Sequence, residues 1–407
     1  MRGRRLAALL MFVVAAAGLV LIARPYINGL SFVIRAADRH GTIRKLADAG
    51  TRRTIERQID IDVPTGAQGK MRGRLYAPDR RPSRMVLLVS GLHPAGIDEP
   101  RLVAFARQLA GSGLAVVTPD IPELSRFEIA PAITDQIEAA ALWLSELSTK
   151  PGATAGDGRI GLIGVSFSGG LSVVAAGRAT LRDRIAYVFS LGGHDDLPRV
   201  LRYLCLGSEA RPPHQLRLTL DATKDVADQL FVRPPDGYAV ALILMGVAER
   251  VAPPRQVTAL RDAVRRFLLA STLDRVDTAK ATREFAALRA LASTLPGPSA
   301  TMLRNMNDRD VVHLGARLLP YVHFYGGAPQ LSPSRSPKPT APVFLLHGVD
   351  DNMIPAIESE YLADGLRGHA PVRLLVTDLI MNSDFIRSPR AGDALRLAGF
   401  WGDLLAQ

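Results

Sequence analysis

The chain has 407 residues, of which 47% are hydrophobic and 22% are charged, so it is long enough and apolar enough to bury a large core. Its formal net charge of +11 favours contact with an acidic membrane surface, but the basic residues are scattered and form no patch of the kind that binds nucleic acid. The single cysteine, Cys205, excludes an intrachain disulfide and a cysteine-based metal site, and its apolar neighbours predict a small buried residue.

The first predicted element is a membrane anchor within residues 1–25. Arginines near the start precede an uncharged apolar stretch, residues 6–23. As a helix this stretch is about 27 Å long, close to the thickness of the hydrocarbon core of a bilayer. The preceding basic residues place that end in the cytoplasm, so the domain is expected on the extracytoplasmic side. A cleaved signal peptide, which gives a secreted protein, is the alternative.

A helical linker and a hairpin come next. Residues 26–56 are rich in Arg, Ala and Leu and predict a helical linker with a break at Gly41. Residues 58–63 and 71–76 alternate polar and apolar side chains on either side of a glycine-containing turn. That pattern predicts a β-hairpin at the start of the folded domain.

Five continuous apolar runs follow the hairpin, and such runs are typical of strands that helices cover on both faces. The runs begin at Met85, Leu114, Ile160, Ala186 and Val343. One more run, 372–376, is interrupted by Arg373 and predicts a less buried strand near the sheet edge. Helical periodicity lies between the runs, at 100–112, 130–148, after Ser166, 357–366 and 391–405. The alternation predicts a doubly wound, mostly parallel sheet.

A long helical insert separates the sixth strand from the seventh. A loop of about 150 residues without structure is improbable in a compact domain. The sequence therefore predicts a helical cap, residues 198–340, over the carboxyl edge of the sheet, between the core segments 57–197 and 341–407. Within the cap, helical periodicity is seen at 197–205, 256–269, 279–291 and 311–321. The Ser- and Pro-rich residues 330–339 have the composition of a linker.

The turn after the fifth strand carries the candidate nucleophile. Ser166 has Gly164 two positions before it and Ser168 two positions after it. A serine on a strained strand-to-helix turn needs small residues at both places. Ser168, flanked by Ser166 and Gly170, fits the same spacing and is the rival nucleophile. The structural alternative is a glycine-rich turn without chemistry.

From about Met85 onward the chain resembles the α/β-hydrolase superfamily, and is most similar to dienelactone-hydrolase-like esterases. The resemblance rests on the turn at Ser166, on residues 90–96 after the third strand and on residues 347–355 after the seventh. The last segment reads His-Gly-Val-Asp-Asp-Asn-Met-Ile-Pro. The resemblance implies an α/β-hydrolase fold with an eight-stranded, mostly parallel sheet and a helical cap inserted after strand six.

Residue roles are implied by the same resemblance. Ser166 is the nucleophile, Asp351 is the acid of the triad, and His347 is a structural residue at the strand end. The backbone N–H of Leu92 or His93, together with that of Phe167, forms the oxyanion hole, which stabilises negative charge on the substrate oxygen.

The triad histidine is missing from the place where the resemblance implies it, the loop after the eighth strand. Asn382 stands there, and an amide cannot accept the serine proton and hold positive charge. His194, after the sixth strand, is the possible substitute base, and His93, His313 and His323 are weaker candidates. Asp195 and Asp196, which follow His194, are expected to cap the next helix rather than to bind a metal.

Two main functions are compatible with these residues. The first is a membrane-anchored serine hydrolase that acts on an ester or similar acyl substrate, hydrophobic if the apolar cap helices line its pocket. The second is a catalytically degenerate hydrolase fold that binds a ligand, lipid or protein. A third, weaker reading makes the cap and basic surface a membrane-associated interaction module. No nucleotide-binding loop and no metal-ligand spacing is present, so no cofactor and no metal are expected.

Overall fold

The computed structural model describes residues 26–35, 41–63, 69–206, 234–274, 276–381, 384–385 and 391–407. The expected anchor at 6–23 and the position Asn382 lie outside the described residues. None of the helices within the described ranges is long and apolar enough to cross a membrane.

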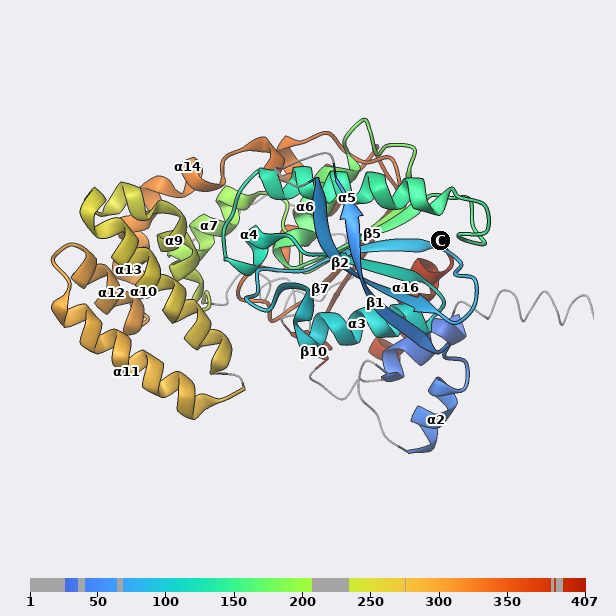
Figure 1. Ribbon diagram of the computed structural model, residues 1–407, viewed down its shortest axis with the longest axis horizontal. Coiled ribbons are helices and arrows are strands. Elements are labelled where there is room, and N and C mark those ends of the chain that lie inside the picture. Colours follow the sequence, from blue (N-terminus) through green and yellow to red (C-terminus); the bar gives the residue numbers. More distant parts are fainter. Residues whose placement is uncertain are drawn as a thin grey trace, which may run out of the picture.

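Eight strands form one sheet in the order β1-β2-β4-β3-β5-β6-β7-β8 (Figure 1). The strands are β1 (Thr54–Asp62), β2 (Lys70–Pro78), β3 (Met85–Val89), β4 (Ala115–Pro119), β5 (Ile160–Val165), β6 (Ile185–Leu191), β7 (Val343–Gly348) and β8 (Val372–Thr377). β2 is antiparallel to both β1 and β4, and the pairs from β4 to β8 are parallel. The predicted eight-stranded, mostly parallel sheet is confirmed. A separate pair of short strands, β9 (Ile380–Met381) and β10 (Asp384–Phe385), follows β8.

Helices cover both faces of the sheet, which explains why its central strands are apolar throughout. One face packs on α5 (Ala132–Ser148), α6 (Phe167–Ala176) and α15 (Ile357–Gly365), and the other on α3 (Pro100–Gly111) and α16 (Ala391–Leu405). Along β3, Leu87 belongs to the first layer of the core and Leu88 to the second. β8, with its partly buried residues, lies at the edge, as the interruption at Arg373 predicted.

The N-terminal part of the described chain packs beneath the second face of the sheet. Residues 26–35 form a helix whose Phe32 ring lies 4.0 Å from the ring of Trp401 in α16. Gly41, with φ 85°, precedes the short helix α2 (Thr42–Asp48), so the predicted break is confirmed. β1 begins at Thr54, within the range predicted as linker, because its first residues also pair with β2.

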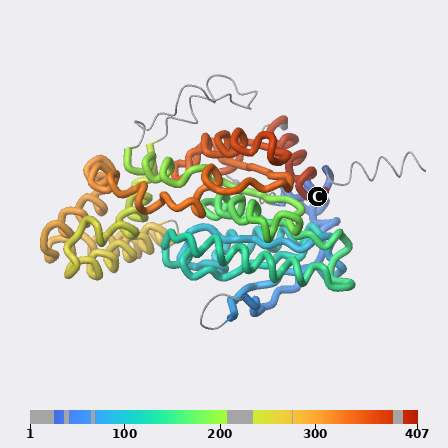
Figure 2. The backbone as a smooth tube through the Cα atoms, turned by 90° about the horizontal axis from the view of Figure 1, so that it is seen from above, coloured from blue at the N-terminus to red at the C-terminus, as the bar shows by residue number. Residues whose placement is uncertain are grey.

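All elements described between β6 and β7 are helical, and they extend beyond the end of the sheet at which β5 and β6 finish (Figures 1 and 2). They are α7 (Leu197–Leu206), α9 (Ala239–Val251), α10 (Pro254–Leu273), α11 (Thr278–Thr294), α12 (Ser299–Asn307), α13 (Val311–Leu318), η3 (Leu319–Tyr321), α14 (Val322–Gly326), η4 (Pro329–Leu331) and η5 (Pro333–Arg335). Two short helices precede α5 in the core, η1 (Gly96–Asp98) and α4 (Pro122–Ser125). Buried side chains of the insert and of the core belong to one continuous hydrophobic cluster.

The interpretation of residues 330–339 as a linker was wrong. Leu331 and Ser332 are fully buried, and the Thr134 hydroxyl donates a hydrogen bond to the carbonyl of Gln330 at 2.8 Å. The Leu197 N–H donates to the Ser332 hydroxyl at 2.9 Å. The prolines begin two 3-10 turns, and the buried residues Leu331, Ser332 and Pro333 pack the segment against the core.

Candidate active site

Ser166 occupies the turn between β5 and α6 in a strained backbone conformation. Its φ of 55° and ψ of −127° lie in a region that residues with a side chain rarely adopt. The turn is fixed because the Ser166 N–H donates to the Leu191 carbonyl at 2.7 Å and the Gly169 N–H donates to the Ser166 carbonyl at 2.8 Å. A Cβ at Gly164 would lie 2.1 Å from the carbonyl oxygen of Ser168, so this close turn admits only glycine there.

The two serines of the turn have different environments. Ser168 is fully buried, and its hydroxyl donates to the carbonyl of Ser90 at 2.6 Å. Ser166 is partly exposed, and within the described residues its hydroxyl has no hydrogen-bond partner. Ser168 therefore fastens α6 to the loop after β3, and Ser166 is the serine of the turn whose hydroxyl is available.

The loop after β3 lies directly against this turn. A Cβ at Gly91 would be 3.4 Å from the Cβ of Ser166. The N–H of His93 donates to the carbonyl of Leu124 at 3.2 Å and is thereby occupied. In the described part of the chain, the N–H groups of Leu92 and Phe167 form no hydrogen bond. The sequence left the N–H groups of Leu92 and His93 as alternative donors to the oxyanion hole. The N–H of Leu92 is the one that remains available.

Asp351 follows β7 and lies beside the loop that follows β6. Its Oδ1 accepts hydrogen bonds from the N–H groups of Met353 at 2.9 Å and Ile354 at 3.0 Å. Its Oδ2 is 3.5 Å from Nε2 of His347, and a Cβ at Gly192 would lie 3.4 Å from the same oxygen. Because Leu191, next to Gly192, accepts the Ser166 N–H, both candidate residues border the end of β6.

His194 is packed in the interior and forms no hydrogen bond with Ser166. It is fully buried, its Nε2 donates to the carbonyl of Leu331 at 2.8 Å, and its Nδ1 has no partner within the described residues. Its ring stacks on Phe167 with centroids 5.4 Å apart. Burial lowers the pKa of the imidazole, which therefore stays neutral near pH 7. With Nε2 donating to Leu331, the lone pair that could accept a proton is on the buried Nδ1.

The other histidines of the described ranges also have no bond to Ser166. His347 is fully buried and bonds to the Ser359 hydroxyl at 2.7 Å and to the Ile354 carbonyl at 2.9 Å, as expected of a structural strand-end residue. Nδ1 of His93 accepts from the Ala95 N–H at 3.2 Å. His313 and His323 lie on exposed faces of the cap. Within these ranges no cluster of three His, Cys, Asp or Glu side chains suited to a metal ion occurs.

A buried ion-pair network holds the loop that carries His194. The Glu358 carboxylate, 2% exposed, accepts the N–H groups of Asp195 and Asp196 at 3.0 and 3.1 Å and the Arg199 guanidinium at 2.6 Å. Sequence reasoning missed Glu358 because its partners lie far away along the chain. Its only signal was a glutamate in the first turn of a core helix.

The two aspartates of this loop have pKa values shifted in opposite directions. Burial and the nearby Glu358 raise the pKa of Asp195 to about 6, although Arg199 opposes the shift. Burial also acts to raise the pKa of Asp196, but the N–H of Arg199 and the charges of Arg335 and Arg199 lower it overall. Asp196 accepts the Arg199 N–H at 2.9 Å and caps α7, which confirms the predicted cap.

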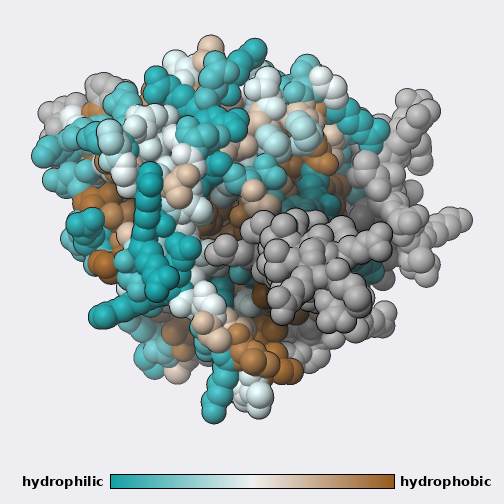
Figure 3. Space-filling model, turned by 90° about the vertical axis from the view of Figure 1, so that its right-hand side faces the viewer, coloured by the Kyte–Doolittle hydropathy of each residue, from teal (hydrophilic) through white to brown (hydrophobic). Residues whose placement is uncertain are grey.

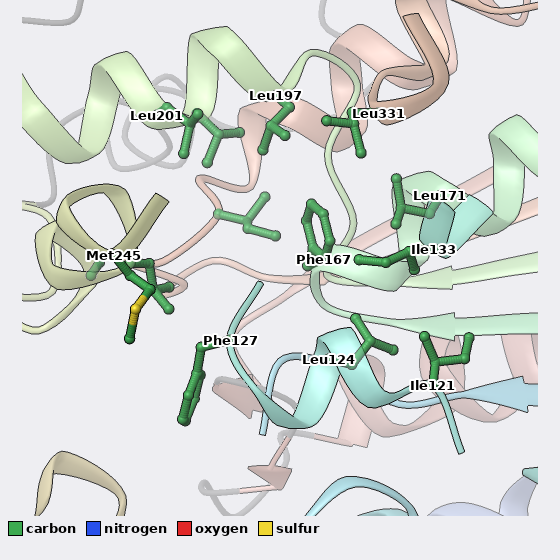
Figure 4. Packing of buried hydrophobic residues seen from close by; sticks show 14 of the residues in the cluster. Ile121, Leu124, Phe127, Ile133, Phe167, Leu171, Leu197, Leu201, Met245 and Leu331 are labelled. Carbon is green, nitrogen blue, oxygen red and sulfur yellow. The ribbon is translucent and has the colours of Figure 1, made fainter. Parts of the chain in front are cut away.

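Apolar side chains from core and cap gather beside the turn (Figure 4). Phe167, next to Ser166, shares one buried cluster with Leu197 and Leu201 of α7, with Met245 of α9 and with Phe127, which follows α4. Cys205 of α7 is 2% exposed, and burial raises the pKa of its thiol to about 12, as expected of a buried apolar residue. The surroundings of the turn at Ser166 are therefore hydrophobic.

No known family profile matches the chain, and no curated protein is similar to it in sequence. Among solved structures, it is similar to an esterase from Pyrobaculum calidifontis, with 15% identity over 95% of this chain and 93% of that chain and a TM-score of 0.44. A protein described as a dienelactone hydrolase, from Klebsiella pneumoniae, shares 12% identity over 87% and 98% of the two chains, with a TM-score of 0.40. An esterase from Pseudomonas putida shares 14% identity over 93% and 96%, with a TM-score of 0.44.

These likenesses are distant, and the fold rests on the molecule's own topology. The order of the eight strands, the reversal at β2 and the strained strand-to-helix turn at Ser166 fit together in one sheet. The chain has the α/β-hydrolase fold.

Proposed function

We propose that the protein is a serine hydrolase that acts on an ester or similar acyl substrate. Ser166 is the nucleophile, the N–H groups of Leu92 and Phe167 form the oxyanion hole, and Asp351 is the acid of the site. The proposal rests on two properties of Ser166. Its backbone is strained, and its hydroxyl forms no hydrogen bond within the described residues.

The strain at Ser166 argues for chemistry at its hydroxyl. A non-glycine residue in this backbone region costs about 1–3 kcal/mol. Glycine adopts a positive φ at little cost, so a purely structural turn gains nothing from the serine. Ser168, by contrast, stabilises the fold through its bond to Ser90. The hydroxyl of Ser166 therefore supports a function rather than the fold.

The neighbouring donors suit a developing negative charge. Phe167 is the first residue of α6, where helix N–H groups have no partner in the preceding turn and the helix dipole is positive. Leu92 contributes the second N–H from the adjoining loop. Preorganised donors of this kind lower the barrier of acyl transfer by stabilising the oxyanion.

Proton transfer from Ser166 is the step of the proposed reaction for which the described residues provide the fewest groups. Attack by Ser166 requires a group that accepts its proton, and no described histidine bonds to it. We therefore propose that solvent water accepts the Ser166 proton and that turnover is slow. Acylation by an activated phenyl ester, whose phenolate leaves without needing a proton, then outruns deacylation, in which water attacks the acyl-serine and must expel the more basic Ser166 oxygen without an imidazole to move its proton.

The surroundings suggest the substrate and the place of action. Phe127, Phe167 and Met245 favour a hydrophobic acyl group near the turn. We further propose that residues 6–23 anchor the protein in a membrane with the hydrolase domain on the extracytoplasmic side.

Labelling with a fluorophosphonate probe tests the nucleophile. The full chain should be labelled, Ser166→Ala should not be, and Ser168→Ala, whose substitution leaves the Ser166 hydroxyl in place, should retain labelling. Asp351→Asn should be labelled more slowly. Equal labelling of the full chain and Ser166→Ala would contradict the proposal.

A degenerate, ligand-binding hydrolase fold is the second candidate function. Asn382 in place of the expected histidine favours it, as do the structural bonds of His194 and His347. This candidate predicts no labelling of the natural chain and a gain of labelling in Asn382→His. The hydrolase proposal predicts labelling of both.

A further inference from the structure

The helix of residues 26–35 carries both buried and exposed apolar side chains. Its inner face packs against the core, where Phe32 and Val33 are 1% and 4% exposed and a Cβ at Gly29 would lie 2.2 Å from the carbonyl of Ala398. Its outer face carries Tyr26 and Ile27, which are 50% and 59% exposed, with Leu30 on the next turn. Packing against the core therefore leaves Tyr26, Ile27 and Leu30 uncovered.

The short helix α2 shows the same excess of exposed apolar surface. Ile43 and Leu46 are 59% and 71% exposed, while Ala47 is its only buried residue. A helix of seven residues is marginal in water unless an amphipathic face packs on something. Ala47 alone gives α2 little such contact.

The two helices form one surface. The Arg35 guanidinium donates to the carbonyl of Ala47 at 3.1 Å and to the Thr51 hydroxyl at 2.8 Å, which joins the end of the first helix to the end of α2. Both lie at the end of the molecule opposite the cap (Figures 1 and 2). We call the exposed side chains of Tyr26, Ile27, Leu30, Ile43 and Leu46 the N-terminal apolar face.

Along the chain, α2 and the residues up to Arg57 carry more basic than acidic side chains. Lys45, Arg53 and Arg57 are exposed and form no ion pair within the described ranges. The nearby acids, Asp48 and Glu56, are paired with Arg44 and Arg107. On this side of the molecule, hydrophobic surface is visible in the lower part, at the height of α2, among hydrophilic side chains (Figure 3).

We propose that the N-terminal apolar face docks on the surface of an anionic lipid bilayer. Apolar side chains on a short helix enter the boundary between headgroups and acyl chains, and adjacent Lys and Arg side chains are attracted to anionic headgroups. The uncharged stretch 6–23 ends just before Tyr26, so a bilayer that holds this stretch lies next to the face. A partner protein would account for the N-terminal apolar face alone. It would not account for the basic residues that follow in the sequence or for the apolar stretch 6–23.

Docking fixes the orientation of the candidate active site. Because the cap lies at the other end of the molecule, the turn at Ser166 is separated from the bilayer by the body of the sheet (Figure 1). Substrate therefore reaches the site from the aqueous side rather than sideways out of the membrane. The docking rests on the proposed anchor at residues 6–23 and is independent of the proposed hydrolysis.

Fluorescence of a single attached probe tests the docking. The full chain carrying Cys205→Ala receives either Leu46→Cys on the face or Val312→Cys on the cap as the matched control, since Val312 is 76% exposed. Each cysteine is labelled with an environment-sensitive nitrobenzoxadiazole dye, and the protein is bound to vesicles of phosphatidylcholine and phosphatidylglycerol. We expect a blue-shifted emission and several-fold stronger quenching by shallow doxyl-labelled lipids at position 46 than at position 312.

Three results would overturn the proposal. Equal, water-like emission at both positions would place the face in solvent. A blue shift at position 46 without quenching by labelled lipid would mean that protein covers the face, either residues 1–25 or a second copy of the chain. Failure of the full chain to float with the vesicles would exclude lipid as its partner.

Discussion

The backbone conformation at Ser166 favours glycine, whereas the proposed reaction requires the serine side chain. Replacement by glycine removes the penalty of a positive φ. We predict that Ser166→Gly raises the free energy of unfolding by about 1 kcal/mol and abolishes labelling by the fluorophosphonate probe. Urea denaturation measures the first effect and gel fluorescence the second.

Ser168→Ala is the matched control for that variant. It removes a buried hydroxyl and leaves the Ser90 carbonyl without its bond, so the free energy of unfolding should fall by about 1–2 kcal/mol while labelling persists. A loss of stability in Ser166→Gly equal to that in Ser168→Ala would show that the Ser166 side chain supports the fold.

The raised pKa of Asp195 predicts a pH dependence of stability. A carboxyl whose pKa is about 6 in the folded chain, above its ordinary value of 3.8, favours folding while it is protonated. Its contribution is complete below pH 3.8 and is lost as the pH rises through about 6. The stability of Asp195→Asn relative to the natural chain should therefore rise by about 2 kcal/mol between pH 4 and 7.

Asp196→Asn should show the opposite pH dependence of stability. The pKa of Asp196 is lowered, so its contribution is present at neutral pH and is lost as the pH falls. Relative to the natural chain, Asp195→Asn should gain stability as the pH rises from 4 to 7. Asp196→Asn should instead lose stability as the pH rises from acid values through 3.8, so its denaturation curves are measured below pH 4. Parallel curves would contradict the assigned environments.

Sequence reasoning found the features that depend on near neighbours. The strained turn at Ser166 was recognisable from its flanking small residues, and the helix cap at Asp196 from its position before a helix. The bond of His194 to Leu331 and the contacts of Glu358 with the loop of Asp195 were not accessible, because they join segments 137 and 163 residues apart. Only the folded chain shows that Nε2 of His194 is bonded to the Leu331 carbonyl.

At the scale of elements, hydrophobic periodicity predicted helices and strands correctly where the burial of each element follows a simple pattern. Central strands buried on both faces and helices with one buried face were found close to their observed positions. α9 was missed because most of its residues between Ala239 and Ala248 are buried, which removes the polar stripe that marks a helix. The segment 330–339 was misread because composition does not show where a proline-rich chain packs.

The packing of that segment gives a prediction for Gly177, which follows α6. A Cβ at Gly177 would lie 1.9 Å from the carbonyl oxygen of Pro337. Gly177→Ala should therefore lower the free energy of unfolding by about 2 kcal/mol through overpacking. Gly392→Ala, in α16 with open space around its Cβ, is the control and should be neutral or slightly stabilising. Equal denaturation midpoints for the two variants would show that the segment is not packed on α6.

At the scale of the whole molecule, the shared hydrophobic cluster predicts that cap and core unfold together. Met245 of α9 is 4% exposed within this cluster. Met245→Ala should lower the midpoint of a single calorimetric transition, at a cost of about 2–3 kcal/mol. Two transitions, with only one shifted by the substitution, would mean that the cap is an independent unit.

Hydrolysis by this protein depends on the Ser166 hydroxyl accepting an acyl group. Tandem mass spectrometry of the full chain after incubation with an activated phenyl ester tests this most directly. We predict a single acyl adduct on Ser166 that accumulates because deacylation is slow, with none in Ser166→Ala. An unmodified Ser166, or an adduct confined to lysines and unchanged in Ser166→Ala, would contradict the account.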